Sequence, residues 1–145
     1  MKVAISSDHG GINIKAEIID LMNEMNIQYE DLGCTCGESV DYPDYALPVA
    51  KKVANKEVDR GILICGTGIG MSIAANKVRG IRCALVHDTF SAQATREHND
   101  SNVLAMGERV IGPGLARDIA KVWLETEFLG GRHARRVEKI TLLEK

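Results

Sequence analysis

A cysteine followed by a glycine-rich loop, within GILICGTGIGMS at residues 61–72, is the strongest candidate for chemistry in this sequence. Cys65 ends an apolar run that predicts a buried strand, and alternating glycines lead from it into a predicted helix. Such a loop can point several backbone N–H groups at a phosphate or a developing oxyanion, and its positive potential favours the thiolate form of the cysteine. The structural alternatives are a small core cysteine and a tight turn that lets a helix pack closely on a sheet.

Three better-known glycine loops fit this segment less well. A Walker A loop continues from its last glycine into Lys-Ser/Thr, whereas Met71 follows Gly70. The dinucleotide fingerprint needs glycine at the Met71 position and follows the first strand of its fold, although Asp88, about twenty residues on, keeps that interpretation as an alternative. A cysteine phosphatase loop needs an arginine at the same position to hold the phosphate, so phosphoryl transfer through the cysteine is not expected.

Asp8 and His9 form a second polar group, directly after the first apolar run. Histidine titrates near neutral pH, which suits proton transfer, but a capping or core role is the alternative for His9. Asp8 is equally compatible with the N-cap of the following helix. Tyr42, in the segment VDYP at residues 40–43, either lines a pocket or belongs to a helix entry.

Residues 96–102, REHNDSN, crowd polar groups before another apolar run. His98 can move protons on sugar oxygens, or it can serve only as a cation at a helix C-terminus. Asn99 is also compatible with a simple turn. These residues are therefore candidates with an open structural alternative.

Arg132 and Arg136 are four residues apart and therefore share one face of a helix. Two guanidinium groups so placed can clamp a phosphate dianion, and Arg109 is a third candidate for that clamp. The alternative is a solvated basic face. His87, Asp88 and His9 offer no i, i+4 or CxxC ligand pair, so no metal is expected.

Composition limits the class of protein. The 145 residues carry a net charge of −2 with 4% aromatic residues, which favours neither nucleic acid nor an anionic membrane as a partner. The N-terminus turns polar early, and no apolar stretch approaches the roughly 20 residues that span a bilayer, so a cytoplasmic location is expected. Cys34, Cys36, Cys65 and Cys83 form no paired CxxC framework and are expected to be reduced.

Short runs rich in β-branched residues alternate with amphipathic stretches and predict an α/β fold with a parallel sheet. The expected strands are 2–6, 28–32, 60–64, 82–86 and 103–105, and the expected helices are 11–25, 46–55, 70–77, 89–98, 114–126 and 133–143. We expect one domain over residues 1–145, a three-layer αβα sandwich with a Rossmann-like sheet. Ligands of such sheets bind beyond the carboxyl ends of the strands. Two glycines at 130–131 are expected to hinge the last helix away from the body, toward a partner chain.

In order, and across essentially the whole chain, these motifs resemble the family of ribose-5-phosphate isomerase B and the galactose-6-phosphate isomerase subunits. The matching segments are SDHGG at 7–11, SVDYP at 39–43, CGTGIG at 65–70, SIAANK at 72–77, REHN at 96–99, GERV at 107–110 and GGRH at 130–133. Some members of the family use a glutamate as base. This chain carries Cys65 and resembles the cysteine type.

The resemblance implies isomerisation between ribose 5-phosphate and ribulose 5-phosphate through a cis-enediolate, without nicotinamide, flavin or metal cofactor. It implies a homodimer, in some members a tetramer, with active sites shared between chains. The implied catalytic residues are Cys65 as carbon acid/base, His98 for ring opening, Thr67 on the enediolate and Asp8 on the sugar hydroxyls. The implied substrate-binding residues are His9, Tyr42, Gly66, Gly68, Ile69, Gly70, Asn99, Arg109, Arg132 and Arg136. The alternatives are a hexose 6-phosphate substrate, such as allose or galactose 6-phosphate, and a non-catalytic nucleotide-binding module.

Overall fold

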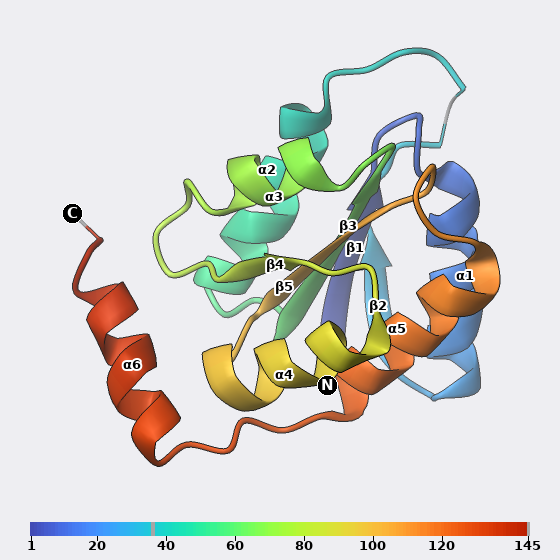
Figure 1. The fold of residues 1–145 in the computed structure, drawn as a ribbon. Coiled ribbons are helices and arrows are strands. Elements are labelled where there is room, and N and C mark those ends of the chain that lie inside the picture. Colours follow the sequence, from blue (N-terminus) through green and yellow to red (C-terminus); the bar gives the residue numbers. More distant parts are fainter. Residues whose placement is uncertain (36, 145) are drawn as a thin grey trace.

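The computed structural model describes residues 1–35 and 37–144, so Cys36 lies outside the described residues. Strands and helices alternate along the chain (Figure 1). The strands are β1 (Lys2–Ser7), β2 (Gln28–Asp31), β3 (Arg60–Cys65), β4 (Cys83–Leu85) and β5 (Val103–Gly107). The helices are α1 (Ile12–Glu24), α2 (Tyr42–Ala54), α3 (Ile69–Ala75), α4 (Thr89–Asn99), α5 (Pro113–Glu125) and α6 (Arg132–Thr141).

All five strands form one parallel sheet in the order β2-β1-β3-β5-β4, which confirms the predicted sheet. The register pairs Ser7 with Ile64 and Cys65 with Gly107, so β1, β3 and β5 end at the same level. Because parallel strands all point the same way, the segments that follow these three strands meet at one edge of the sheet. This carboxyl edge is where the fold brings distant sequence motifs together.

Side chains alternate between two apolar layers along the central strands. Ile62 and Ile64 face a core built with α1, α4 and α5, whereas Leu63 and Cys65 face a core built with α2 and α3. The period of two along a buried strand explains this division, because each face of the sheet needs its own cover of helices. The predicted three-layer αβα sandwich is confirmed, and the Cys65 thiol lies on the α3 side.

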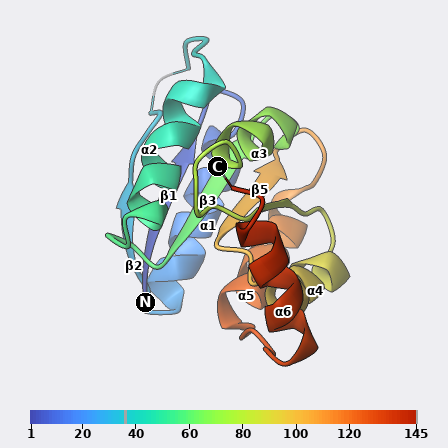
Figure 2. The same ribbon diagram turned by 90° about the vertical axis from the view of Figure 1, so that its left-hand side faces the viewer.

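Helix α6 stands outside the three layers and packs beside α4 (Figures 1 and 2). The connection from α5 to α6 passes through Gly130 and Gly131, whose φ angles of 67° and 56° are positive. Such angles suit glycine, because other residues meet a steric penalty there. The Leu129 N–H donates to the Glu97 carbonyl oxygen at 3.2 Å, which joins this connection to α4. No helix within residues 1–35 and 37–144 is long and apolar enough to cross a bilayer.

Most element boundaries differ from the sequence-based expectation by one or two residues, and two of the differences affect the site. Helix α2 begins at Tyr42 rather than at residue 46, because Pro43 fits the first turn of a helix, where its missing N–H costs no hydrogen bond. Strand β5 runs to Gly107 rather than to residue 105, because Met106 and Gly107 still pair with β3. The longer β5 carries its following loop up to the level of Cys65.

Candidate active site

A cleft of about 440 Å³ opens at the carboxyl edge of the sheet. Its lining comes from the segments after β1, β3 and β5, together with the first turns of α2 and α3. The lining residues are Asp8, Tyr42, Cys65, Gly66, Thr67, Ile69, Gly70, Ile73 and Arg109. The cleft therefore collects most of the predicted site residues, and it adds Ile73, which lies in the SIAANK motif but was not predicted as a site residue.

The Cys65 side chain is held against the glycine loop. Cys65 is 5% exposed, and the Gly68 N–H donates a hydrogen bond to its Sγ at 3.0 Å. This hydrogen bond places partial positive charge next to the sulfur. Gly68 has a φ of 77°, and a Cβ at this position would lie 2.8 Å from the Met106 carbonyl carbon. Backbone conformation and space both require glycine at this point. The close approach of this loop to β5 is what aims the N–H at the thiol.

The loop after β5 completes the wall of the cleft. The Glu108 N–H donates to the Cys65 carbonyl oxygen at 2.9 Å, and the Arg109 N–H donates to the Gly66 carbonyl oxygen at 3.0 Å. The exposed Arg109 guanidinium lies over Gly66, where an added Cβ would be 3.4 Å from Nη1. A fixed positive charge thus stands beside the thiol loop and can attract an anionic ligand.

Thr67 and Tyr42 border the same loop on its open side. The Thr67 hydroxyl oxygen accepts a hydrogen bond from the Ile69 N–H at 3.3 Å, so the hydroxyl hydrogen of Thr67 points away from that N–H and can be donated to another acceptor. The Tyr42 ring packs directly against Gly70, because a Cβ at that position would overlap the ring. Tyr42 therefore both opens helix α2 and lines the cleft, which joins the two interpretations that its sequence position allowed.

Asp8 is buried, with 6% of its surface exposed, and its Oδ1 accepts a hydrogen bond from the Gly10 N–H at 2.8 Å. It does not cap helix α1, so the N-cap alternative is wrong. The Ile14 N–H of that helix instead donates to Oε1 of Glu108 at 2.7 Å, from a loop 94 residues away in the sequence. The Asp8 carboxylate is thereby left at the cleft, next to the thiol loop.

His9 lies beside the cleft rather than in its lining. Its Nδ1 accepts a hydrogen bond from the Val40 N–H at 3.1 Å, so the ring is tied to the loop that leads into α2. The acceptor role of Nδ1 leaves Nε2 as the nitrogen that can contact a ligand.

A second cleft of about 320 Å³ lies between the end of α4 and the start of α6. It is lined by His98, Asn99, Arg132, His133, Arg136, Val137 and Ile140. The two histidine rings are stacked, with centroids 4.4 Å apart and planes 18° apart. His133 was not among the predicted site residues, and its position next to Arg132 in the segment GGRH was the only signal for it in the sequence.

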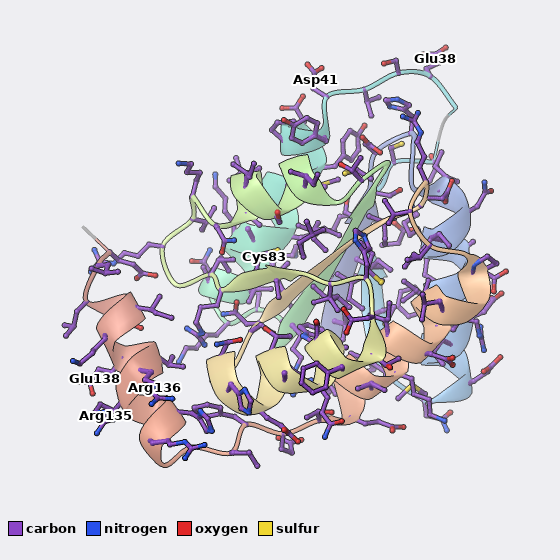
Figure 3. The ribbon with its side chains drawn as sticks, in the orientation of Figure 1. Glu38, Asp41, Cys83, Arg135, Arg136 and Glu138 are labelled. Carbon is purple, nitrogen blue, oxygen red and sulfur yellow. The ribbon has the colours of Figure 1, made fainter. Side chains whose placement is uncertain are left out.

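The two clefts lie at opposite edges of the sheet. Helix α4 leaves the carboxyl edge after β4 and returns to the amino edge, where Asn99 precedes β5. A strand rises by about 3.3 Å per residue, so the length of β5 alone separates the edges by roughly 15 Å. Figure 3 shows Asp41, next to Tyr42 of the first cleft, far from Arg136 of the second. One chain therefore does not bring Cys65 and His98 together.

Much of the polar crowding at residues 96–102 is structural. The buried Arg96 donates to Asp100 at 2.9 Å and to the carbonyl oxygens of Ser101 and Thr126 at 2.6 and 3.1 Å. The Asn102 side chain pairs with residues of the loop before β4. These contacts tie the end of α4 to neighbouring segments, and they leave His98 and Asn99 as the two residues of this stretch that reach the second cleft.

His87 and Asp88 also have structural partners. The His87 Nε2 accepts a hydrogen bond from the Gly107 N–H at 2.9 Å, and burial lowers the pKa of the ring. Asp88 caps α4 by accepting hydrogen bonds from the Ser91 N–H and hydroxyl, which hold the pKa of its carboxyl below its ordinary value. This use of Asp88 argues against a ribose-binding role in a dinucleotide site. Across residues 1–35 and 37–144, no group of three or more His, Cys, Asp or Glu residues is placed to hold a metal ion.

Comparison with known proteins matches residues 3–140 to the ribose/galactose isomerase family. A Bacillus subtilis (strain 168) protein, YwlF, whose name describes it provisionally as a sugar phosphate isomerase, is 73% identical over 100% of this chain and 98% of its own. Ribose-5-phosphate isomerase B of Escherichia coli (strain K12) is 50% identical over 99% of this chain and 97% of its own.

Solved structures agree with the sequence relatives. The structure of ribose-5-phosphate isomerase B from Clostridium thermocellum superimposes with a TM-score of 0.97 at 56% identity, over 99% of this chain and 97% of that one. A further relative, named D-erythrulose-4-phosphate isomerase, from Pectobacterium atrosepticum, is 46% identical over 99% of this chain and 95% of its own. The predicted resemblance is confirmed: this chain belongs to the ribose/galactose isomerase family.

Proposed function

We propose that this chain interconverts ribose 5-phosphate and ribulose 5-phosphate through a cis-enediolate. The observation that carries the proposal is the Cys65 thiol, held by the Gly68 N–H at the mouth of a glycine loop in an open cleft. The E. coli and C. thermocellum relatives, whose names state this activity, support the choice of substrate. The proposed mechanism uses only side chains and backbone groups of the protein.

The carbon chemistry requires a base that gives its proton back. In the proposed step, the Cys65 thiolate removes the proton from C2 of the open-chain aldose, the electron pair of that C–H bond forms the C1–C2 double bond of the enediolate, and the π electrons of the C1 carbonyl move to the C1 oxygen. The thiol then returns the proton to C1, while the C2 oxygen becomes the ketone. Asp8, buried beside the loop, moves the hydroxyl proton between the two oxygens. No proton is gained or lost overall.

The enediolate carries negative charge that must be stabilised as it forms. The backbone N–H groups of residues 66–70 and the Thr67 hydroxyl border the space above the thiol, and Arg109 adds a positive charge at its rim. Donors of this kind are fixed by the fold before the substrate binds, and each can contribute roughly a hundredfold or more to the rate. Tyr42 and Ile69 supply apolar surface beside these donors.

The second cleft completes the site in the proposal, through a second copy of the chain. His98 opens the sugar ring with Asn99 beside it, and Arg132 and Arg136 clamp the phosphate together with His9 and Arg109. The separation of the two clefts within one chain supports this arrangement, because neither cleft holds all the groups that the reaction needs. The smallest assembly consistent with it is a homodimer with two-fold symmetry, which contains two composite sites.

Turnover of purified protein on a panel of four-, five- and six-carbon sugar phosphates, with chelator present and no cofactor added, tests the proposal. We expect ribose 5-phosphate to have the highest kcat/KM. A preference for allose 6-phosphate, galactose 6-phosphate or erythrulose 4-phosphate would change the substrate and keep the mechanism. Absence of isomerisation on the whole panel, together with tight binding of an adenosine nucleotide in a parallel titration, would replace the proposal with the nucleotide-binding alternative.

A further inference from the structure

Helices α4 and α6 meet at a pair of parallel imidazole rings. The His98 and His133 centroids are 4.4 Å apart with 18° between the planes, and His133 is only 9% exposed. His133 lies in the first turn of α6, where its N–H donates to the Gly130 carbonyl oxygen at 3.0 Å. One side of the His98 ring is therefore covered by a second ring whose backbone is fixed.

The charges around His133 oppose its protonation. Arg132 and Arg136 face it from α6, and His98 faces it from α4, while Glu97 of α4 acts in the opposite direction. Burial, followed by these three cations, lowers the pKa of His133 below its ordinary value. Two protonated rings in contact would also repel each other. Of the two stacked rings, His133 is buried and His98 is exposed, so His98 is the ring that is open to a ligand in the second cleft.

We propose that His133 is a positioning residue, a ring that stacks on His98 and fixes the plane of the His98 ring in the second cleft. This inference rests on the proposed function. In ring opening the anomeric hydroxyl loses its proton, the bond between C1 and the ring oxygen breaks, the C1 carbonyl forms and the ring oxygen gains a proton. One imidazole can accept the first proton and donate the second, provided that its plane is held in line with both oxygens.

The chemistry of the two sugars separates this step from the carbon chemistry. Ribose 5-phosphate closes a five-membered ring through its C4 hydroxyl, so forward turnover requires ring opening. Ribulose 5-phosphate is acyclic, because its phosphate occupies the C5 oxygen that would be needed to close a five-membered ring on the C2 ketone. Exchange of a C1 hydrogen of ribulose 5-phosphate with solvent requires the Cys65 step and no ring opening. A defect confined to His98 must therefore appear in the first reaction and spare the second.

The experiment compares His133→Ala, His133→Phe and Arg135→Ala in the full-length protein. Each variant is assayed for turnover of ribose 5-phosphate and, in D2O, for deuterium entering C1 of ribulose 5-phosphate. We expect His133→Ala to lose roughly tenfold or more of the forward kcat/KM, within the range of a misplaced acid/base, and to keep exchange within about twofold of the wild type. The retained exchange also shows that the variant is folded.

His133→Phe keeps a flat ring in the stack and cannot titrate, so we expect it to recover most of the forward rate. Arg135 lies on the outer side of α6 (Figure 3), and Arg135→Ala should match the wild type in both assays. Equal losses in both assays for His133→Ala, an unchanged forward rate, or a Phe variant as impaired as the Ala variant would each overturn the positioning role. A wild-type protein inactive on both sugars would instead overturn the proposed function.

Discussion

The two clefts of this molecule are built by different means. The cleft at Cys65 is made largely of backbone, with hydrogen bonds that join the ends of β1, β3 and β5 and glycines that let the loops approach closely. The cleft at His98 is made of side chains that project from two helices, one of which joins the body through Gly130 and Gly131. The first is positioned by the sheet, and the second by the packing of α6 on α4.

This difference matches the chemistry that we propose for each cleft. Stabilising an enediolate needs donors that are fixed before the reaction, which a sheet edge provides. Binding a phosphate and opening a ring need charged side chains brought by another element. The comparison therefore predicts that changes in the first cleft act on the carbon step and that changes in the second act on binding and ring opening.

Cys65→Ala should have the largest effect. Without a carbon base, we expect turnover to fall by roughly a thousandfold or more, and deuterium exchange into the sugar carbon to be lost. The matched control is Cys83→Ala, because Cys83 is a half-buried thiol on β4, outside both clefts, whose pKa is raised to about 12 by desolvation. The control should keep its activity. Near-normal turnover of Cys65→Ala would show that another group removes the proton.

A mixture of two inactive variants tests whether the clefts combine between chains. Cys65→Ala and His98→Asn are unfolded and refolded together, so that random pairing makes half of the dimers mixed. Each mixed dimer then has one doubly altered site and one intact site, and the sample should recover roughly a quarter of wild-type activity under two-fold symmetry. No recovery, with mixed dimers seen by native mass spectrometry, would mean that each site is built within one chain.

Replacement of Arg132 or Arg136 by alanine should have an intermediate effect. We expect KM for the sugar phosphate to rise by roughly tenfold or more, and kcat to fall less, because phosphate binding also orients the reacting end. Lysine at either position should restore part of the loss, since it keeps the charge and loses the two-pronged geometry. If both alanine variants had unchanged kinetics, the arginines would be a solvated basic face.

His87→Gln should have the smallest effect, and it should appear in stability. The His87 ring accepts the Gly107 N–H in its neutral form, and its pKa in the folded protein is lowered from 6.5. Below about pH 6.5 the His87 ring binds protons more readily in the unfolded chain than in the folded protein. The contribution of the neutral ring to stability is therefore complete above about pH 6.5, and it is lost as the pH falls toward the pKa of the folded protein. Glutamine can accept the same hydrogen bond and does not titrate. The melting temperature of the His87→Gln variant should therefore drop less than that of the wild type between about pH 7.5 and pH 5.5. Parallel curves for the two proteins would contradict this role of His87.

Local patterns were sufficient for the elements and for the first cleft. The β-branched runs and amphipathic stretches predicted the alternation of strands and helices, because burial on two faces of a sheet imposes a period of two and packing of a helix imposes a period near four. The residues after β1, β3 and β5 could be placed together from the sequence, since the ends of parallel strands share an edge. The same rule predicts that Asp8, Cys65 and Arg109 lie at one edge of the sheet, as the structure shows.

The tertiary structure decided the contacts that depend on how distant segments return. The sequence does not state that Glu108 caps α1, that Arg96 is buried under the end of α4, or that His133 stacks on His98. Each of these depends on the path of a whole helix or connection, and no local pattern encodes that path. The division of the predicted site between two edges of the sheet has the same origin, because α4 carries His98 back across the length of the strands while Cys65 stays where its strand ends.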